Sequence, residues 1–349
     1  MHSRFLPRVF HSPGVRSAAK GAAGGPSRRA QLGEVRNCLV ARGLGLLGLR
    51  PRWPGAFGIL TYHRVAPPVA PFSTPTWNVS PARFEAQLSG LMARGYRPWP
   101  LRRLLACQHA MQPVPSKTFV ITFDDGYQSV YQNAYPLLRE YGVPATLFLA
   151  TAYLDSPGPF PFDDWPEAGD SRVPSAMWRP LRSAECEEML AGGLIELGTH
   201  THVHADFRGR PQELRADLAV SMEVLRARFG IAEASLALPY GYGCRQNDGP
   251  ELAQAAKEAG VLCALTADSE LVRLGDDPFN WPRFGALDTD TVASLETKLD
   301  GRYSLARSAW RWLRRGGKRH GVRPDGDLDA SGHDWPRSAR AKEADACKC

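Results

Sequence analysis

The sequence has few cysteines, no paired cysteine motif and no long hydrophobic run. Its seven cysteines among 349 residues are odd in number and form no Cys-x-x-Cys pair, which excludes a zinc ribbon and argues against a disulfide framework. The longest apolar stretch, about residues 39–49, is too short to cross a membrane. No acid and no continuous apolar segment precedes Glu34, so no signal peptide is expected. We expect a cytoplasmic protein with reduced thiols and no stable membrane insertion.

The net charge of +7 is unevenly distributed. Residues 1–52 carry ten Lys and Arg against one acid, and residues 302–349 carry twelve against six, whereas residues 53–301 carry 21 against 29. A domain that binds nucleic acid more often concentrates its basic residues in the folded part, so no nucleic-acid partner is expected. The distribution predicts a mostly disordered basic extension (1–52), a folded domain (53–301) and a basic tail (302–349) that is first helical and then disordered.

Short apolar runs alternate with helical patterns between the two basic tails. Regular alternation of this kind favours a parallel sheet whose strands are connected by crossover helices. Periodicity alone does not distinguish a doubly wound sheet from a barrel. The expected strands are 58–64, 118–124, 145–151, 194–199, 235–239 and 261–266, with a seventh near 96–99 or 281–284, and the expected helices are 81–94, 129–141, 183–191, 211–229 and 249–259.

Two adjacent aspartates follow one of these buried strands. The apolar, β-branched run at residues 118–123 leads directly to Asp124 and Asp125 and then to a glycine. Two ionised carboxylates side by side repel each other and are costly to bury, so a cation, a shared proton or open water must relieve their charge. Alone, the motif is equally consistent with a turn at the end of a strand.

Three histidines lie within five residues farther along the chain, at His200, His202 and His204. Imidazole and carboxylate ligands together suit zinc and similar divalent ions. One carboxylate with two histidines leaves a coordination position open, as in catalytic rather than structural zinc sites. In a straight strand the three histidines share one face, whereas if the strand ends near His200, then His200 and His204 converge and His202 points elsewhere.

Four motifs resemble the polysaccharide deacetylases, carbohydrate esterase family four, and they follow one another along the chain in the order of that family. They are TFDDG at 122–126, HTHVH at 200–204, LALPYG at 236–241 and GILTYHRV at 58–65, the last of which resembles the opening strand of a bacterial exopolysaccharide branch. The matches cover roughly residues 57–300. The resemblance implies an α/β fold, namely the distorted, incomplete (β/α) barrel of this family, and a catalytic domain that deacetylates N-acetylhexosamine polymers.

The resemblance also implies a division of roles among the motif residues. Asp125 with His200 and His204 would bind a divalent metal, with zinc expected and cobalt or nickel as alternatives. Asp124 would accept the proton of the attacking water. The backbone N–H of Tyr240 would stabilise the tetrahedral oxyanion.

Two positions depart from the family pattern. Many members carry an Arg two residues before the Pro-Tyr, where this chain has Ala237. Arg283 is the candidate to replace it, with a surface salt bridge as the alternative. Many members also supply the general acid from a late Leu-x-His strand that is missing here. His63 is then the best remaining histidine to protonate the leaving amine, with a structural role at a strand end as the alternative.

A segment rich in Pro, Gly and aromatic residues occupies positions 153–180. We interpret it as a packed surface loop, with a wall for stacking sugar rings as the alternative. Within it, Phe162, Asp163 and Asp164 repeat the Phe-Asp-Asp tripeptide. Because no apolar strand precedes this copy, we expect it to be unrelated to the site.

The leading hypothesis is a metal-dependent hydrolase that removes N-acetyl groups from an N-acetylated polysaccharide or its precursor and releases acetate. A substrate like poly-N-acetylglucosamine is favoured over chitin. An amidohydrolase-type enzyme that uses the His-x-His pair is an alternative, and it would make His202 essential. A non-catalytic carbohydrate-binding relic is a second alternative, against which the intact Asp124 argues.

Overall fold

The computed structural model describes residues 36–41, 43, 54–241 and 249–308. Most of the predicted extension 1–52 and the tail beyond residue 308 therefore lie outside the described residues. Residues 36–41 are helical, and Cys38 packs in the main hydrophobic core together with Tyr303. The chain divides after Arg307, and Ser308 alone of the second unit is described.

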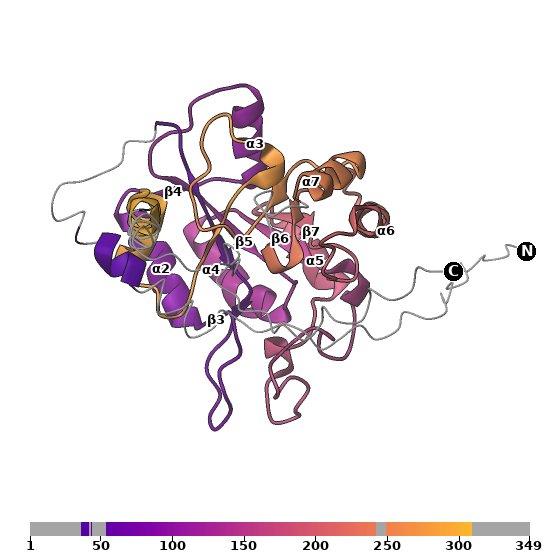
Figure 1. Cartoon of the computed structure of the whole chain (residues 1–349). Coiled ribbons are helices and arrows are strands. Elements are labelled where there is room, and N and C mark those ends of the chain that lie inside the picture. Colours follow the sequence, from indigo (N-terminus) through magenta and orange to yellow (C-terminus); the bar gives the residue numbers. More distant parts are fainter. Residues whose placement is uncertain (1–35, 42, 44–53, 242–248, 309–349) are drawn as a thin grey trace, which may run out of the picture. The chain divides into compact units, whose positions relative to one another are not determined.

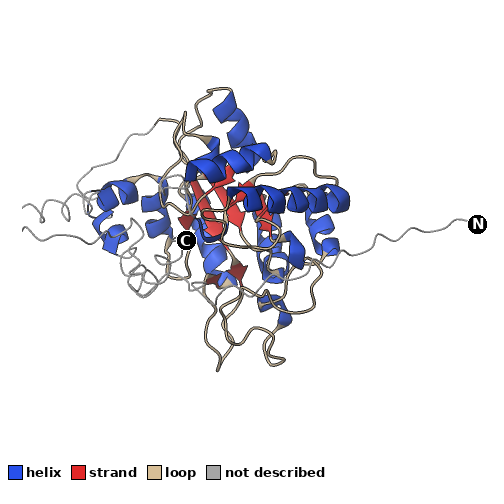
Figure 2. Cartoon of the chain, turned by 45° about the vertical axis from the view of Figure 1, so that its right-hand side comes forward, coloured by secondary structure: helices blue, strands red, loops and turns tan. Residues whose placement is uncertain are grey.

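A parallel sheet of eight strands forms the centre of the fold, with helices around it (Figures 1 and 2). The strand order is β10-β1-β5-β6-β7-β8-β9, and β4 pairs with the first residues of β5. Two further strands, β2 and β3, form a separate parallel pair. The strands are β1 (Gly58–Tyr62), β2 (Arg64–Val65), β3 (Asn78–Val79), β4 (Arg97–Pro98), β5 (Thr118–Phe123), β6 (Ala145–Leu149), β7 (Ile195–Thr199), β8 (Leu236–Ala237), β9 (Ala264–Leu265) and β10 (Phe284–Gly285).

The buried residues of the strands fall into two clusters, because successive side chains of a strand point to opposite faces of the sheet. Along β5, Phe119 and Ile121 pack in one buried cluster, whereas Val120 packs in another. The second cluster also contains Ile59 of β1 and Leu265 of β9, two strands that are far apart in the sheet order. Side chains from such distant strands can share one cluster because the sheet is curled. This curl favours the barrel over the doubly wound sheet.

One short segment of chain connects the two edges of the curled, incomplete sheet. Trp281 forms an isolated parallel bridge with Leu265 of β9, and three residues later Phe284 of β10 pairs with Leu60 of β1. The chain between them carries Arg283, which is therefore placed between the two edges of the sheet. The expected distorted, incomplete (β/α) barrel is confirmed.

The helices follow the expected alternation, with two additions. The chain at 101–109 and 292–299 forms helices that were not expected, although the apolar spacing of Leu101, Leu104 and Leu105 is a helical signal. The expected helix 129–141 begins with a π-helical turn, Val130–Ala134. The α-helices are α2 (Pro81–Ala93), α3 (Leu101–His109), α4 (Tyr135–Tyr141), α5 (Ser183–Ala191), α6 (Pro211–Phe229), α7 (Gly249–Glu258) and α8 (Val292–Leu299).

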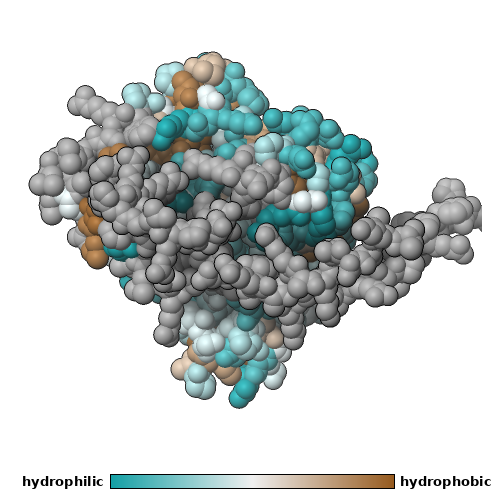
Figure 3. Space-filling view, viewed as in Figure 1, coloured by the Kyte–Doolittle hydropathy of each residue, from teal (hydrophilic) through white to brown (hydrophobic). Residues whose placement is uncertain are grey.

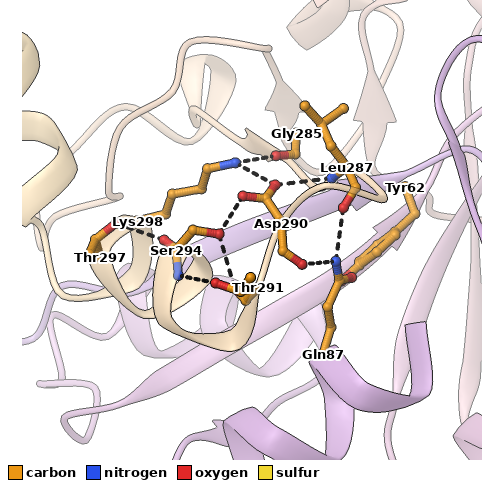
Figure 4. A network of polar contacts seen from close by, with 9 residues as sticks. All are labelled: Tyr62, Gln87, Gly285, Leu287, Asp290, Thr291, Ser294, Thr297 and Lys298. Atoms are coloured by element: carbon orange, nitrogen blue, oxygen red, sulfur yellow. Dashed lines mark hydrogen bonds and ion pairs between the residues drawn. The ribbon is translucent and has the colours of Figure 1, made fainter. Parts of the chain in front are cut away.

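A buried ion pair fastens β10 and α8 to the rest of the domain (Figure 4). Lys298 Nζ of α8 lies 2.8 Å from Asp290 Oδ2 and donates to the carbonyl oxygen of Gly285 at 2.8 Å. The side-chain amide of Gln87 in α2 donates to the carbonyl oxygen of Asp290 at 2.9 Å and accepts a hydrogen bond from the Tyr62 hydroxyl at 3.0 Å. These contacts hold the short strand β10 beside β1.

On the face shown in Figure 3, the visible described residues are mostly hydrophilic, and the hydrophobic areas among them are small and separate. None of the described helices has the length and apolar character that a membrane-spanning helix requires. The exposed large hydrophobic side chains among the described residues are scattered along the chain, apart from the adjacent Leu39 and Val40, and they are Leu39, Val40, Met111, Val203, Val220, Tyr240 and Leu305.

Candidate active site

Asp125 and two histidines meet where β5 and β7 end. Both strands pair with β6, and parallel strands end at the same edge of a sheet. The Nε2 atoms of His200 and His204 each lie 3.3 Å from Asp125 Oδ1, and all three residues are buried. In the part of the chain that the structure describes, this is the one group of His, Cys, Asp or Glu with the spacing of metal ligands.

The geometry of this group fits a divalent metal ion. Zinc lies about 2.0–2.2 Å from nitrogen and oxygen ligands, so the ligand atoms of a tetrahedral site are about 3.3 Å apart. His200 Nδ1 lies 2.8 Å from the carbonyl oxygen of Ala237, a bond that assigns the proton to Nδ1 and leaves the Nε2 lone pair free. The set Asp125, His200 and His204 can therefore hold such an ion.

The turn after β7 separates His202 from the other two histidines. The strand ends at Thr199, and both Thr201 (φ +65°) and His204 (φ +53°) adopt left-handed backbone conformations. His202 Nδ1 instead lies 3.0 Å from the hydroxyl of Thr151. The straight-strand arrangement of the three histidines is therefore wrong, and the turned one is observed.

A carboxylate from α6 stabilises this turn. The two oxygens of Asp217 accept hydrogen bonds from the backbone N–H groups of His202, at 2.5 Å, and Val203, at 3.1 Å. The hydroxyl of Thr201 accepts a third, from His204 N at 3.1 Å. Side-chain oxygens thus accept hydrogen bonds from backbone N–H groups that no longer pair with a neighbouring strand. These bonds fix the turn and with it the direction of the His204 side chain.

Asp124 pairs with Arg283 rather than with the metal ligands. Arg283 Nη1 and Nη2 donate to the two carboxylate oxygens of Asp124 at 2.6 and 2.8 Å. The guanidinium also donates to the hydroxyls of Thr61 and Thr122, at 3.1 and 3.3 Å, and to the carbonyl oxygen of Thr266 at 3.2 Å. Arg283 is 1% exposed, so the alternative of a surface salt bridge is wrong.

Both carboxyl groups have lowered pKa values despite their burial. Burial alone would raise the pKa of Asp124, but the charge and hydrogen bonds of Arg283 outweigh it. For Asp125, the effect of burial is outweighed by hydrogen bonds to His200 and His204, and its pKa lies well below the ordinary value. Both aspartates are therefore ionised. Asp124 pairs with the guanidinium of Arg283, and Asp125 contacts the imidazoles of His200 and His204.

His63 and Tyr240 complete the set of expected site residues. His63 follows β1, and burial lowers its pKa while the nearby carboxylates of Asp125 and Asp124 oppose that effect. Tyr240 follows β8 with a left-handed backbone (φ +59°), and its ring centre lies 5.2 Å from that of His204. The structure thus brings every expected site residue to one end of the barrel.

Several side chains of this site lie on strained backbone. Asp125 (φ +70°), His204 and Tyr240 all adopt the left-handed conformation that non-glycine residues rarely enter. Such strain persists where surrounding contacts enforce it, and it concentrates at functional sites.

Two aromatic rings at the site were missed from the sequence. Phe162 stacks on His204 with ring centres 3.7 Å apart and planes 18° from parallel, and Trp77 stacks on His63 at 5.1 Å and 18°. The interpretation of residues 162–164 as unrelated to the site is therefore wrong, although Asp163 is no metal ligand and instead pairs with Arg64. The aromatic content of 153–180 was the available signal for Phe162, whereas no sequence signal pointed to Trp77.

Comparisons with known proteins agree with this geometry. Residues 111–264 match the family model described as polysaccharide deacetylase. The matched segment carries Asp125, His200 and His204. A relative, the poly-beta-1,6-N-acetyl-D-glucosamine N-deacetylase of Staphylococcus aureus (strain MSSA476), is 25% identical over 234 residues, which cover 64% of this chain and 73% of the relative.

Two solved structures share the fold. IcaB from Ammonifex degensii aligns with a TM-score of 0.57 and 23% identity, over 70% of this chain and 97% of that one. The Streptococcus pyogenes deacetylase PplD, solved with acetate, aligns with a TM-score of 0.58 and 20% identity, over 70% of this chain and 99% of that one. The resemblance to the polysaccharide deacetylases drawn from the four sequence motifs is confirmed.

Proposed function

We propose that this protein is a metal-dependent hydrolase that removes N-acetyl groups from an N-acetylhexosamine polysaccharide or its precursor and releases acetate. The observation that carries the proposal is the pair of adjacent aspartates with separate partners, Asp125 among two histidines and Asp124 on Arg283. The match to the polysaccharide deacetylase family model supports the reaction, and the name of the S. aureus relative supports a β-1,6-linked polymer of N-acetylglucosamine.

The metal ligands in this proposal are Asp125, His200 and His204. Nitrogen and oxygen ligands in this number suit zinc first and cobalt or nickel next. An ion held there supplies Lewis-acid polarisation of the acetamide carbonyl and a lower pKa for the attacking water. Asp124, held by both of its oxygens on Arg283, accepts the proton of that water.

His63 and Tyr240 act on the other side of the scissile amide. His63 donates the proton that the leaving amine requires. The backbone N–H of Tyr240, presented by its left-handed conformation, stabilises the oxyanion.

The domain limits and the compartment are also part of the proposal. We place the catalytic domain at 53–301, between the basic segments. Among the described residues, Cys107, Cys186 and Cys263 carry free thiols, which supports a reducing, cytoplasmic location. Cell fractionation of the tagged full chain tests the location, and recovery outside the cytoplasm would contradict it.

The two alternative functions lack a supporting contact among the described residues. An amidohydrolase that uses the His-x-His pair needs His202 as a ligand. Nδ1 of His202 instead lies 3.0 Å from the hydroxyl of Thr151, and His202 does not belong to the ligand group. A binding-only relic has no need for a paired base, yet Asp124 keeps both of its hydrogen bonds to Arg283.

An acetate-release assay with matched polymers tests the proposed function. The full chain, loaded with zinc, should release acetate from β-1,6-linked N-acetylglucosamine oligomers and more slowly from β-1,4-linked ones. Chelation should remove the activity, and added zinc should restore it. Asp124→Asn should keep the zinc and lose the acetate release by a factor of about 10³. Undiminished release by chelated protein or by Asp124→Asn would contradict the proposal.

A further inference from the structure

The three imidazoles of the site are oriented in two different ways. His200 donates from Nδ1 to the carbonyl oxygen of Ala237. The Nδ1 atoms of His63 and His204 are buried and have no hydrogen-bond partner among the described residues. These are the two imidazoles on which an aromatic ring stacks, each within 18° of parallel. Stacking therefore takes the place of the second hydrogen bond that usually fixes the ring of a metal-binding or catalytic histidine.

The two stacking rings belong to separate loops that meet at one guanidinium. Arg64 Nη1 donates to the carbonyl oxygen of Thr76 at 3.1 Å, and Thr76 directly precedes Trp77. Arg64 Nη2 forms an ion pair with Asp163, which directly follows Phe162. One side chain thus contacts the residue adjacent to each of the stacking rings.

The surroundings of Arg64 make this contact rigid. The side chains of Arg64 and Asp163 are 3% and 1% exposed, and Arg64 Nε donates to the carbonyl oxygen of Met177 at 2.9 Å. The guanidinium also lies over the ring of Tyr127, 3.9 Å from its centre. A buried ion pair tolerates little movement because any displaced charge would lose its partner. The planar fork of an arginine can reach these three acceptors at once, whereas the ammonium of a lysine cannot.

We propose that Arg64 is a positioning residue of this site: its guanidinium ties the loops of Trp77 and Phe162 together and so holds the planes of His63 and His204. The chemical roles of the two imidazoles rest on the proposed function, whereas the contacts that hold their planes do not. Without the tie, each ring is free to rotate about its side-chain bonds. His204 then binds a metal ion less well, and His63 presents its proton less well.

The first test compares two neighbouring phenylalanines. Phe162→Leu removes the ring on His204, whereas Phe160→Leu removes a ring of equal size from the same aromatic cluster, 4.9 Å from Phe162. We expect Phe162→Leu to weaken zinc binding about tenfold in a chelator competition and to change the visible spectrum of the cobalt-substituted protein. Phe160→Leu should leave both unchanged.

The second test removes the tie itself without leaving a buried charge. In the double variant Arg64→Met with Asp163→Asn, no ion remains unpaired, so the protein is expected to fold. The matched control is Arg179→Met with Glu185→Gln, which removes another largely buried ion pair, 3.2 Å long, near the same loop. The Arg64 pair should lose about tenfold in zinc affinity and in kcat, and Arg64→Lys should not recover either. The control pair should lose thermal stability alone.

The outcomes separate the positioning role from the proposed function. Equal zinc affinity and equal cobalt spectra for Phe162→Leu and Phe160→Leu would overturn the positioning role, whatever the activity of the natural protein. The expected zinc and cobalt results from a protein that releases no acetate would uphold the positioning role and contradict the proposed function. Loss of zinc affinity in both double variants alike would reduce Arg64 to a structural residue and overturn its assignment.

Discussion

The site is built from two regions that hold their side chains by different means. At the ends of β5 and β7, Asp125 and His200 are placed by the ladder of the sheet, and a backbone carbonyl orients His200. In the loops around residues 72–79 and 160–180, side chains do the same task, through stacking and a buried ion pair. The strand ends fix where a group lies, whereas the loops fix how a ring is turned. Mutations at the two regions should therefore differ in kind.

Removal of a ligand at the strand ends should have the largest effect. His204→Ala or Asp125→Ala leaves two protein ligands, so we expect loss of stoichiometric zinc and of measurable acetate release. His202→Ala is the matched control because its imidazole bonds to Thr151, outside the ligand group, and acetate release should stay within about threefold. Metal analysis after dialysis and the acetate assay measure both. Full release by His204→Ala would refute the ligand assignment.

Loss of the arginine that holds the base should come next. Arg283→Met removes both hydrogen bonds from Asp124 but leaves the three ligands unchanged, so kcat should fall about 10²-fold while the zinc content stays at one. Arg283→Lys keeps the charge and loses the fork, so it should retain intermediate activity. Steady-state kinetics with metal analysis provide the test. A parallel loss of zinc would indicate that the two aspartates are not independent.

A buried ion pair away from the ligands should affect stability more than chemistry. Lys298→Met leaves the Asp290 carboxylate buried without its partner, which should cost about 3 kcal/mol in the free energy of unfolding. Lys257→Met breaks an exposed pair with Asp277 and should cost at most about 1 kcal/mol. Urea unfolding of the two variants measures the difference. Similar losses for both would show that burial of the Lys298 pair is energetically unimportant.

The smallest effect is expected at the side chain of Tyr240. Its proposed role belongs to the backbone N–H, and asparagine tolerates the left-handed conformation at φ +59°. Tyr240→Asn should therefore change kcat by no more than about threefold and raise KM, because the exposed ring is lost. Kinetics on the same oligomer test this expectation. A decrease of kcat by more than about 100-fold would show that the catalytic role belongs to the phenol ring and not to the backbone N–H.

Much of the fold could be predicted because the strands are short, apolar and separated by helical patterns. The expected strand at 118–124 is observed at Thr118–Phe123, and both candidate positions for a seventh strand, near 96–99 and 281–284, carry short strands. The helices α3 and α8 were missed because nine and eight residues are too short to establish a helical period, although Leu101, Leu104 and Leu105 of α3 carry the helical spacing. Local pattern indicates which segments are buried, but not which neighbour buries them.

The sequence by itself determined the candidate ligands, since carboxylate and imidazole groups at the ends of apolar strands are costly to bury unless they bind a cation or one another. The tertiary structure decided what surrounds the Asp124 and Asp125 pair and the histidines. The bond from Arg283 to Asp124 spans 159 positions, and the stacking of Phe162 on His204 joins a loop to the turn after β7. Neither contact leaves a periodic trace in the chain, because both arise only when the curled sheet brings its strand ends and loops together.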